Sequence, residues 1–563
     1  MPAASIIRFT KRRKERVVFL LIIILAIFFR FYRLGTLPPG FLPEEVSNGW
    51  NAYSLLKTGR DEWGVFLPLV FRETGGYKLA LNSYLIVPSL FIFGVNELAV
   101  RIPAALASVL SVVLTYFLVI HVFKNKKYAL AAAFLLAVTP WHIAVGRYGE
   151  EVNLGVPLFL SGLILFLKGL RTPKLLIVSA VCFGLTYYVY FSYVGFTSLF
   201  LFGLFWIYRK VLWSQELRRY VLVFGIIMVI CILPYITNPA LKVRFSQTTS
   251  VSTTGLVNRI NEHRGACERV YPTFLCRVLY NKGIDRAYEF FKNYTSHYST
   301  GTFFVRGAEY GLSSMPEGWG FLHLHDFIFI AFGMVVLLHR RLFPGVFVLW
   351  LSAFSIPSAL VDDGHIWRMF PLLPLPQIVA GVGLVEFLRK MKWSIFNFGM
   401  IALIVVSVSK FWVDYTAYFP LFQAMRGYFG FREVYATLGP IEETYDRIYI
   451  APTNLKFDQT YIYYVFYLRP DPRILQNGDD VERITNDDGW VRITRIGKWN
   501  FIDDIRSVFD TFSERSLVVT DGAFDDKMVL TSKDKRIFIP TLLHTVTAPD
   551  GAPAFKIFEY AKK

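Results

Sequence analysis

Two adjacent carboxylates, Glu44 and Glu45, follow a Pro-Pro-Gly-x-x-Pro sequence at residues 38–43. Prolines and a glycine in this spacing restrict the backbone, so the acids that follow are held in a defined position. They come soon after the first long apolar segment, and charged groups beside hydrocarbon need water, a cation or a substrate to remain charged. A positioned carboxylate is suited to general-base catalysis. The pair therefore predicts a reaction centre at a membrane surface.

Cationic side chains recur in other connections between apolar segments. Three of these side chains, Lys78, His365 and Arg368, could stabilise negative charge electrostatically. His365 and Arg368 stand three apart at an expected helix start, so they share a face and could grip a phosphate. In the alternative interpretation, Arg368 extends to the membrane interface and His365 has no role. Together these cations predict a site for an anionic lipid head group.

The short turn at residues 146–153 carries a third group of polar side chains, Arg147, Glu150, Glu151 and Asn153. Its acids are candidates for the site. They could equally cap the helix that follows, because acids complement the dipole at a helix N-terminus. Both interpretations stay open on the sequence alone.

Two other charged runs read as ordinary turns. Asp362 and Asp363 are interpreted as solvated turn residues, and residues 60–62, Arg-Asp-Glu, as a local ion-pair turn. Neither run is placed among the candidate site residues.

The composition predicts that apolar helices carry the candidate acidic and basic side chains. Hydrophobic residues make up 54% of the chain, the mean hydropathy is +0.42, and the runs Val17–Phe29 and Val221–Leu233 contain no charge. Soluble domains of this length lack such runs, whereas bundles of transmembrane helices have them. The net charge of +18 is spread in short basic clusters between apolar runs, which indicates membrane topology and not a nucleic-acid partner.

Basic clusters set the expected orientation. Six Lys and Arg residues between positions 8 and 16 precede the first apolar segment, so the N-terminus is expected in the cytoplasm, with an uncleaved anchor behind it. Every second connection from there is basic. This alternation of basic and other connections is consistent with about 11 membrane spans. They are expected at residues 17–34, 98–122, 128–146, 152–169, 174–190, 193–209, 219–236, 322–339, 343–361, 369–388 and 394–413.

One apolar run, Leu79 to Phe93, is short for a span, and counting it would invert every later loop. We interpret it as an interfacial or re-entrant segment. The alternative is a true span with a weak charge bias elsewhere.

Two domains are predicted. Residues 1–414 form the transmembrane domain, with a first outside loop at 35–97 and a long outside loop at 237–321. Residues 415–563 have more charge and short β-like runs at 447–450, 516–520, 536–539 and 555–560, with a helical pattern at 503–512 between them. This region is expected to be a small extracytoplasmic α/β domain, and its role is open between acceptor docking and stabilisation of the loops.

Cysteine usage agrees with this topology. Cys267 and Cys276 lie in the long outside loop and are candidates for a disulfide in an oxidising compartment, the alternative being two free thiols. Cys182 and Cys231 fall inside expected spans and are interpreted as packing residues.

Several segments resemble glycosyltransferase family 39, in its bacterial branch. They are PPGFLPEEVSNGWNAYSLLKTGRDEWGVFLPLVF, YK, VNELAVRIPAALASVL, TPWHIAVGRYGEEVN, CERVYPTFLCRVLYNK, FFKNYTSHYS and GHIWRMFPLLP, and they run in order from about residue 30 to 390. The family includes protein O-mannosyltransferases and the lipid A aminoarabinose transferase. The resemblance implies a GT-C fold: a polytopic α-helical bundle with a large extracytoplasmic loop, here followed by the C-terminal α/β domain.

The resemblance also implies roles for particular residues. The first-loop acidic pair of the family, usually Asp-Glu, falls on Glu44-Glu45, so Glu44 is the expected general base and Glu45 its catalytic neighbour. The extra methylene of Glu44 moves its carboxylate by about an ångström relative to Asp. The second-loop pattern of Arg, an acid and Asn falls on Arg147, Glu151 and Asn153.

The donor side of the resemblance rests on three cations. Lys78 matches the lysine that contacts the lipid phosphate in similar enzymes, and His365 and Arg368 match the late-loop His and Arg expected near that phosphate. Where the lipid A enzyme has a metal-binding acid before this lysine, the present chain has Tyr77. No metal is therefore assigned, and no cofactor is expected with certainty.

The resulting hypothesis is an inverting membrane glycosyltransferase in the plasma membrane. It would move a sugar from a polyprenyl-phosphate-linked donor to a hydroxyl of a protein, a glycan or a lipid on the extracytoplasmic face, with membrane lipids and no nucleic acid as further partners. The rival hypothesis is a transporter or flippase of lipid-linked sugars. A transporter should place charges near the bilayer midplane, whereas this chain concentrates them at one face, which favours the enzyme.

Overall fold

The structure, a computed structural model, describes most of the chain. The described residues are 2–73, 76–238, 253–307, 315–342, 344–361, 365–391, 394–425, 428–452, 460–485, 491–507, 515–525, 530–531 and 537–562. They form two compact units. The first consists of residues 1–30, 106–146 and 151–411, and the second of residues 31–105, 147–150 and 412–563.

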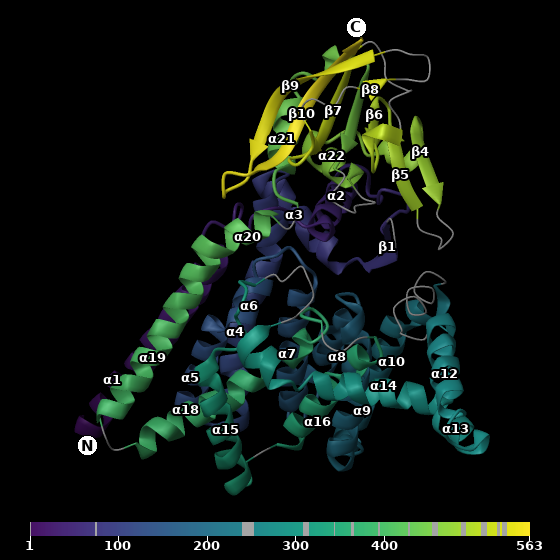
Figure 1. The fold of residues 1–563 in the computed structure, drawn as a ribbon. Coiled ribbons are helices and arrows are strands. Elements are labelled where there is room, and N and C mark those ends of the chain that lie inside the picture. Colours follow the sequence, from purple (N-terminus) through teal and green to yellow (C-terminus); the bar gives the residue numbers. More distant parts are fainter. Residues whose placement is uncertain are drawn as a thin grey trace. The chain divides into compact units, whose positions relative to one another are not determined.

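The first unit is a bundle of apolar helices (Figure 1). Its helices are α1 (Pro2–Phe31), the greater part of α4 (Glu97–Phe123), α5 (Lys126–Val138), α6 (Pro140–Val145), α7 (Val152–Gly169), α8 (Leu175–Thr186), α9 (Phe191–Leu212), α10 (Gln215–Thr237), α15 (Leu324–His339), α16 (Gly345–Ala353), α17 (Ile356–Ala359), α18 (Leu375–Lys390) and α19 (Ser394–Val413). The short segment η2 (Phe370–Leu372) precedes α18, and η3 (Asp414–Tyr418), which follows α19, belongs to the second unit.

Six helical segments in the described part of the chain are long and apolar enough to cross a membrane. They are Glu97–Phe123, Val152–Gly169, Phe191–Leu212, Gln215–Thr237, Phe370–Lys390 and Ile395–Ala424, and four shorter apolar helices accompany them. The chain is thus a multi-pass, largely helical membrane protein, and the number of about 11 spans stays a prediction.

One expected span, residues 128–146, is two helices. Thr139 adopts an extended conformation between α5 and α6, and Pro140 opens α6. A residue before proline is disfavoured in the helical region, and proline suits the first position of a helix. At the start of α6 the Trp141 main-chain N–H is not bonded within the helix, and it donates to the Phe321 carbonyl at 3.1 Å.

The expected long outside loop contains helices of its own. α12 (Thr253–Cys267), α13 (Thr273–Leu279) and α14 (Lys282–Ser296) form an arm that projects from the bundle of the first unit (Figure 1), and η1 (Thr302–Arg306) follows. A disulfide bond joins Cys267 and Cys276. Cys182 and Cys231 are free and half-buried.

This pairing predicts the result of alkylation under denaturing, non-reducing conditions. Two of the four cysteines, Cys182 and Cys231, should be labelled, because the other two are joined. Peptide mass mapping measures this, and adding a reductant should raise the count to four. Labelling of Cys267 without reductant would contradict the pairing.

The second unit contains an eight-stranded sheet in the order β4-β5-β6-β3-β7-β10-β9-β8. The strands are β3 (Arg447–Ala451), β4 (Val481–Thr485), β5 (Val491–Ile496), β6 (Trp499–Phe501), β7 (Arg515–Asp521), β8 (Leu530–Thr531), β9 (Ile537–Thr547) and β10 (Pro553–Lys562). β3 runs parallel to β6 and β7, and the other pairs are antiparallel. The four β-like runs of the sequence lie on β3, β7, β9 and β10, although Arg536 is outside the described residues.

Alternation along the strands gives this sheet two buried faces. Ile448 and Ile450 of β3 belong to a large core, while Tyr449 and Ala451 belong to a smaller core on the opposite face. α21 (Phe431–Leu438) and α22 (Tyr461–Leu468) supply the large core (Figure 1). Further short helices are α20 (Phe419–Met425), η4 (Glu442–Thr444), α23 (Arg473–Asn477) and η5 (Ile505–Ser507). The predicted helix at 503–512 coincides only with η5, and residues 508–512 lie outside the described part.

The first outside loop shares this core with the C-terminal strands. It folds into α2 (Pro43–Thr58), the hairpin β1 (Val70–Glu73) and β2 (Gly76–Leu79), and α3 (Leu81–Phe93). Trp50 of α2 and Ile86 of α3 are fully buried in the large core with Phe466 of α22. Gly49 makes this contact possible, because a Cβ there would meet the Phe466 ring at 2.6 Å. Residues 415–563 are therefore packed together with the loop that carries the acidic pair.

Candidate active site

Glu45 is a buried carboxylate that accepts four hydrogen bonds. It is fully buried, and the Arg101 guanidinium donates to both of its oxygens at 2.8 and 3.1 Å. The main-chain N–H groups of Gly149 and Leu42 donate to it as well, at 2.7 and 3.1 Å. A buried carboxylate stays charged when a cation and several donors surround it. Glu45 therefore acts as a fixed anion that joins three separate segments.

Arg101, near the start of α4, holds the rigid proline sequence in place. Its guanidinium is buried and donates to the carbonyl oxygens of Leu34, Pro38 and Gly40 at 3.1, 3.1 and 2.8 Å. Gly40 has a φ of +75°, a left-handed conformation that glycine adopts without strain. Arg101 thus holds the path of residues 34–40 into α2 at three carbonyl groups.

The turn at residues 147–150 is anchored to the same structure. The carbonyl of Gly149 accepts hydrogen bonds from Asn82 and Asn48 at 2.8 and 3.3 Å. A Cβ on Gly149 would stand 2.9 Å from Val100 and 3.3 Å from a Glu45 oxygen, so only glycine fits there. The turn is held against α2, α3 and α4 at once.

Arg147 is also buried, between the rings of Trp412 and Tyr415 at 5.7 and 5.6 Å. It donates to the carbonyl oxygens of Tyr32 and Leu37. Cation–π contacts and main-chain acceptors occupy this side chain. In this structure Arg147 holds the main chain before the proline sequence.

Glu44 differs from its neighbour because it is exposed. It stands in the first turn of α2, where the helix dipole favours a negative charge. The Lys78 ammonium donates to the main-chain carbonyl of Glu44 at 3.0 Å and lies 3.7 Å from a Glu73 oxygen. Glu73 in turn accepts a hydrogen bond from Ser47 at 2.7 Å. An accessible carboxylate and a buried ammonium are thereby brought to the same end of α2.

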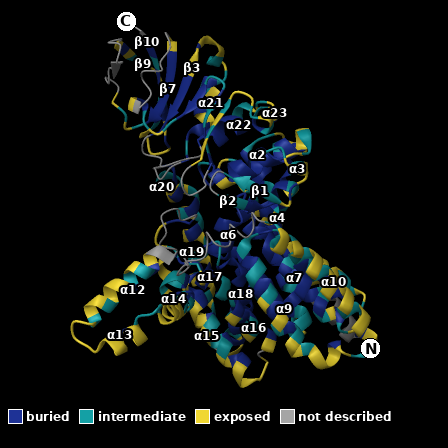
Figure 2. Ribbon diagram, turned by 90° about the vertical axis from the view of Figure 1, so that its right-hand side faces the viewer, coloured by how far each residue is buried: buried dark blue, intermediate teal, exposed yellow. Residues whose placement is uncertain are grey.

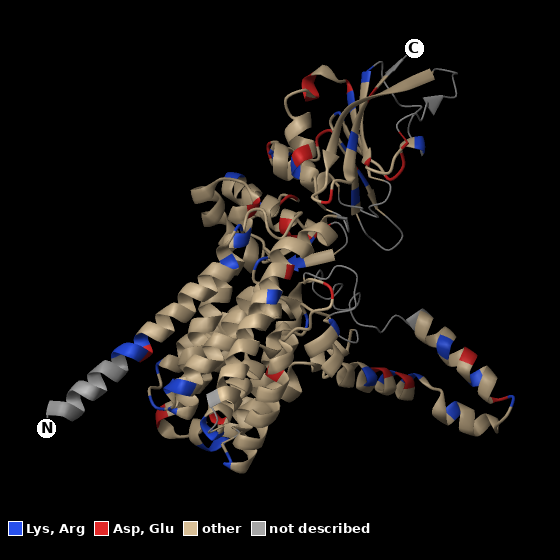
Figure 3. Cartoon of the chain, turned by 60° about the vertical axis from the view of Figure 1, so that its left-hand side comes forward, with Lys and Arg blue, Asp and Glu red and all other residues tan. Residues whose placement is uncertain are grey.

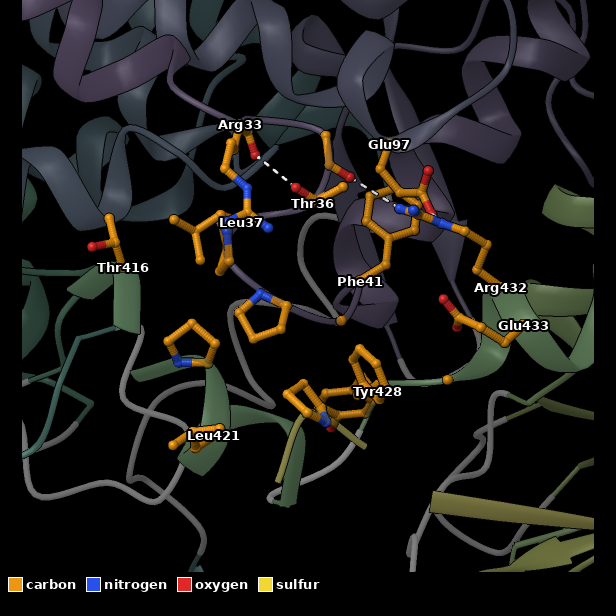
Figure 4. A pocket seen from close by; sticks show the side chains of 18 of the residues that line it. Arg33, Thr36, Leu37, Phe41, Glu97, Thr416, Leu421, Tyr428, Arg432 and Glu433 are labelled. Atoms are coloured by element: carbon orange, nitrogen blue, oxygen red, sulfur yellow. Dashed lines mark hydrogen bonds and ion pairs between the residues drawn. The ribbon is translucent and has the colours of Figure 1, made fainter. Parts of the chain in front are cut away.

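A cavity of about 380 Å³ borders the proline sequence (Figure 4). Leu37, Pro38, Pro39, Gly40 and Phe41 form one side of it, and residues of the C-terminal region form the other, among them Thr416, Leu421, Tyr428, Arg432 and Glu433. Arg432 is paired with Glu97 at 2.6 Å. Burial and the nearby negative charge of Glu44 raise the pKa of Tyr428 above its ordinary value. Because Tyr428 lines the cavity, this effect indicates that the cavity lies near Glu44.

Residues 60–62 are not the ion-pair turn expected from the sequence. Arg60 donates to the Gly64 carbonyl, and Asp61 accepts from the main-chain N–H groups of Trp63 and Val65. Glu62 is 2% exposed, with the hydroxyl of Tyr461 at 3.4 Å from one oxygen. Burial, and then the negative charges of Glu73 and Asp61, raise the pKa of Glu62 to about 8. Sequence spacing could not reveal this contact, because Tyr461 lies in α22.

The buried Glu62 predicts a pH-dependent stability. Its pKa is raised in the folded state, so its contribution is fully present below the unfolded value near 4.5 and is lost as the pH rises through about 8. Each pKa unit corresponds to about 1.4 kcal/mol. Thermal unfolding in detergent should show the wild type losing stability from about pH 5 to about pH 9, and Glu62→Gln should lose much less. Equal slopes in Glu62→Gln and in the exposed control Glu443→Gln would contradict this role.

Four predicted site residues lie in the first unit. Glu151 and Asn153 stand at the start of α7 and are buried, and the Asn153 amide donates to the Val145 carbonyl at 2.6 Å while its Oδ1 has no hydrogen-bond partner among the described residues. His365 is half-buried, with its Nδ1 accepting from the Trp367 N–H at 3.3 Å, and burial lowers its pKa. Arg368 is half-buried too. Asp362 and Asp363 fall outside the described residues.

No group of three His, Cys, Asp or Glu side chains is arranged to hold a metal ion within the described ranges. The described part of the site consists instead of carboxylates, guanidinium groups, one ammonium and main-chain donors.

Arg101 is the main residue that the sequence interpretation missed. It stands 56 positions from Glu45, and nothing local connects the two. The available signal was an arginine near the start of a long apolar helix, where a charge is costly unless it is paired. The ion pair between Glu45 and Arg101 can therefore be recognised in the folded structure but not in the sequence.

Comparisons with known proteins agree with this architecture. Residues 80–237 match the family model described as dolichyl-phosphate-mannose-protein mannosyltransferase. The resemblance to this group of glycosyltransferases is confirmed. No curated protein sequence matches the chain significantly.

Solved structures show the same fold. ArnT from Cupriavidus metallidurans matches in its apo state at 12% identity and a TM-score of 0.52, over 98% of both chains. The same protein bound to undecaprenyl phosphate matches at 12% identity and a TM-score of 0.51, over 96% of this chain and 97% of ArnT. The archaeal oligosaccharyltransferase AglB from Archaeoglobus fulgidus, in complex with an inhibitory peptide and a dolichol-phosphate, has 13% identity over 91% of this chain and 70% of AglB, with a TM-score of 0.48. The two ArnT matches show that the chain has the fold of this GT-C glycosyltransferase.

Proposed function

We propose that this protein is an inverting membrane glycosyltransferase. It transfers a sugar from a polyprenyl-phosphate-linked donor to an acceptor hydroxyl on the extracytoplasmic face, with Glu44 as the general base. One observation carries the proposal: Glu44 is an exposed carboxylate on a support that Glu45, Arg101 and Gly149 fix rigidly. ArnT has been solved with undecaprenyl phosphate, which is the kind of lipid carrier that the donor would use.

The reaction is a single displacement. Glu44 takes the proton of the acceptor hydroxyl, and the hydroxyl oxygen attacks the anomeric carbon of the sugar. The bond between that carbon and the phosphate oxygen breaks, and the polyprenyl phosphate leaves with the electron pair. Attack from the face opposite the leaving group inverts the anomeric centre. General-base catalysis of this kind contributes about 10²–10⁴-fold.

Lys78 supplies positive charge for the leaving phosphate in this proposal. Its ammonium is almost fully buried, where an electrostatic contact is stronger than in water. Its bond to the Glu44 carbonyl places it beside the base. His365 and Arg368, which lie in the first unit, are proposed as phosphate-binding residues.

Arg147 and Glu45 have positioning roles in this proposal. Main-chain carbonyls and aromatic rings engage the Arg147 guanidinium, and Glu45 is surrounded by four donor contacts. They determine where Glu44 stands. Glu151 and Asn153 are proposed to orient the substrate at the start of α7.

The protein would work in the plasma membrane with its N-terminus in the cytoplasm. Two features support this orientation: every second expected connection in the sequence is basic, as the positive-inside rule requires, and the disulfide bond fits an oxidising compartment. The acceptor is a protein, a glycan or a lipid that presents a hydroxyl.

Transport of the lipid-linked sugar is the competing function, and one reconstitution separates the two. Purified protein in liposomes would receive a labelled polyprenyl-phospho-sugar pool and a membrane extract as the acceptor source. The proposal predicts a labelled product that no longer partitions with the polyprenyl lipid, with an inverted anomeric centre by NMR. Labelled lipid that crosses the bilayer without any product would establish the transporter instead.

A further inference from the structure

The helical arm of the first unit exposes large apolar side chains. We define the arm as residues 253–296, which hold α12, α13 and α14, and its tip as residues 267–279. Phe274 is 80% exposed and Val270 is 74% exposed. Tyr271, Leu275, Val278 and Leu279 are exposed beside them. Figure 2 shows exposed residues along most of α12 and α13. Contiguous apolar surface of this kind marks an interaction site.

The apolar surface continues along one side of α14. Ile284, Tyr288 and Phe291 recur at helical spacing and are 45%, 71% and 63% exposed. The other side of α14 faces the protein: Glu289 pairs with Arg259 of α12, and Asn293 is buried. The exposed apolar side is thus a defined face of an amphipathic helix.

The base of the arm is fixed to apolar helices of the bundle. Asn293 donates to the Ala359 carbonyl at 3.2 Å, and the hydroxyl of Tyr294 donates to Ser352 at 3.2 Å. Tyr298, just after the arm, donates to the Leu351 carbonyl at 2.6 Å. These acceptors lie in the apolar segment Gly345–Ala359. The arm is thus fastened to an apolar helical segment of the bundle.

The charge of the arm favours the lipid surface over a protein. It carries seven Lys and Arg against four Asp and Glu, and Figure 3 shows them distributed along all three helices. Arg269 and Arg277 are exposed within the apolar tip itself. Cations interspersed with aromatic and aliphatic side chains are typical of helices that lie in the interface of an anionic membrane. The disulfide between Cys267 and Cys276 joins the end of α12 to α13, the helix that contains Phe274.

We infer that the tip of this arm inserts into the membrane and binds anionic lipid beside the bundle. The tip then acts as a lateral anchor, with Phe274 among the acyl chains and Arg269 and Arg277 at the phosphates. This binding does not depend on the proposed transfer reaction.

Photocrosslinking in the full-length protein tests the inference. Benzoylphenylalanine would replace Phe274, and in a matched variant it would replace Asn261, an exposed polar position of α12. A third variant would carry it at Tyr288. After illumination in phosphatidylglycerol liposomes, positions 274 and 288 should give several-fold more lipid adduct by mass spectrometry than position 261. An intact disulfide in each variant shows that the arm has folded.

Two outcomes would overturn the insertion of the tip, and a third would overturn its preference for anionic lipid. A covalent dimer of the protein from position 274 would make the tip an interface between copies. Lipid yields at 274 no higher than at 261 would remove the tip from the bilayer. The charge component is tested with phosphatidylcholine, where the yield should fall, and Arg269→Gln with Arg277→Gln should abolish that lipid preference. Equal yields in both lipids for the parent variant would contradict binding to anionic lipid.

Discussion

Replacing Glu45 by Gln is expected to destabilise the protein by about 3–5 kcal/mol, because it leaves the buried Arg101 without its counter-ion. The change keeps the size of the side chain, so the loss reflects charge and hydrogen bonding. Thermal unfolding of the purified protein in detergent measures it. The exposed pair of Asp471 and Arg473 provides the control, and Asp471→Asn should change stability by less than about 1 kcal/mol.

A double-mutant cycle separates the ion pair from general damage at this position. Arg101→Met alone should also be costly, since Glu45 would keep a buried charge. The double variant should be less destabilised than the sum of the two single variants, because no buried charge is then left unpaired. A Glu45→Gln variant as stable as Asp471→Asn would contradict the role given to Glu45.

Replacing Glu44 by Gln is expected to lower sugar transfer by about 10²–10⁴-fold. The amide keeps the shape of the side chain and removes the basic oxygen. Stability should change little, because Glu44 is exposed and its contact to Lys78 uses the main-chain carbonyl. Initial rates of transfer from a labelled donor, with thermal unfolding in parallel, measure both properties.

Two variants control this result. Glu443→Gln removes another exposed carboxylate of the second unit and should leave transfer unchanged. Glu44→Asp keeps a carboxylate and shifts it by about an ångström, so it should retain more activity than Glu44→Gln. Equal losses in Glu44→Asp and Glu44→Gln would indicate that shape, and not basicity, matters at this position.

The sequence could predict the features that depend on local pattern. Apolar length indicated the helices of the bundle, short β-like runs indicated β3, β7, β9 and β10, and the proline sequence indicated that Glu44 and Glu45 are positioned together. These signals are contained in segments of a few to about twenty residues. The break at Thr139 was missed even so, although the following Pro140 was a local signal for it.

The functions of the individual acids could not be predicted in this way. Glu44 and Glu45 are neighbours in sequence, but one is exposed and the other is fully buried against Arg101. Glu62 likewise faces Tyr461, 399 positions away. Such contacts are set by tertiary packing, because α2 and α22 bury their apolar sides in one core. Burial influences the charge and the role of a carboxylate. The sequence alone does not show which of two adjacent acids is buried.

A single-turnover experiment tests whether Glu44 is the general base. Wild-type protein and Glu44→Gln would be loaded with labelled polyprenyl-phospho-sugar in liposomes and freed of excess donor, and the retained label would give donor binding. Membrane extract would then be added and the label followed. We expect equal loading, rapid transfer by the wild type, and retention of the label on the lipid by Glu44→Gln. Transfer by Glu44→Gln at the wild-type rate would contradict the assignment of Glu44 as the base.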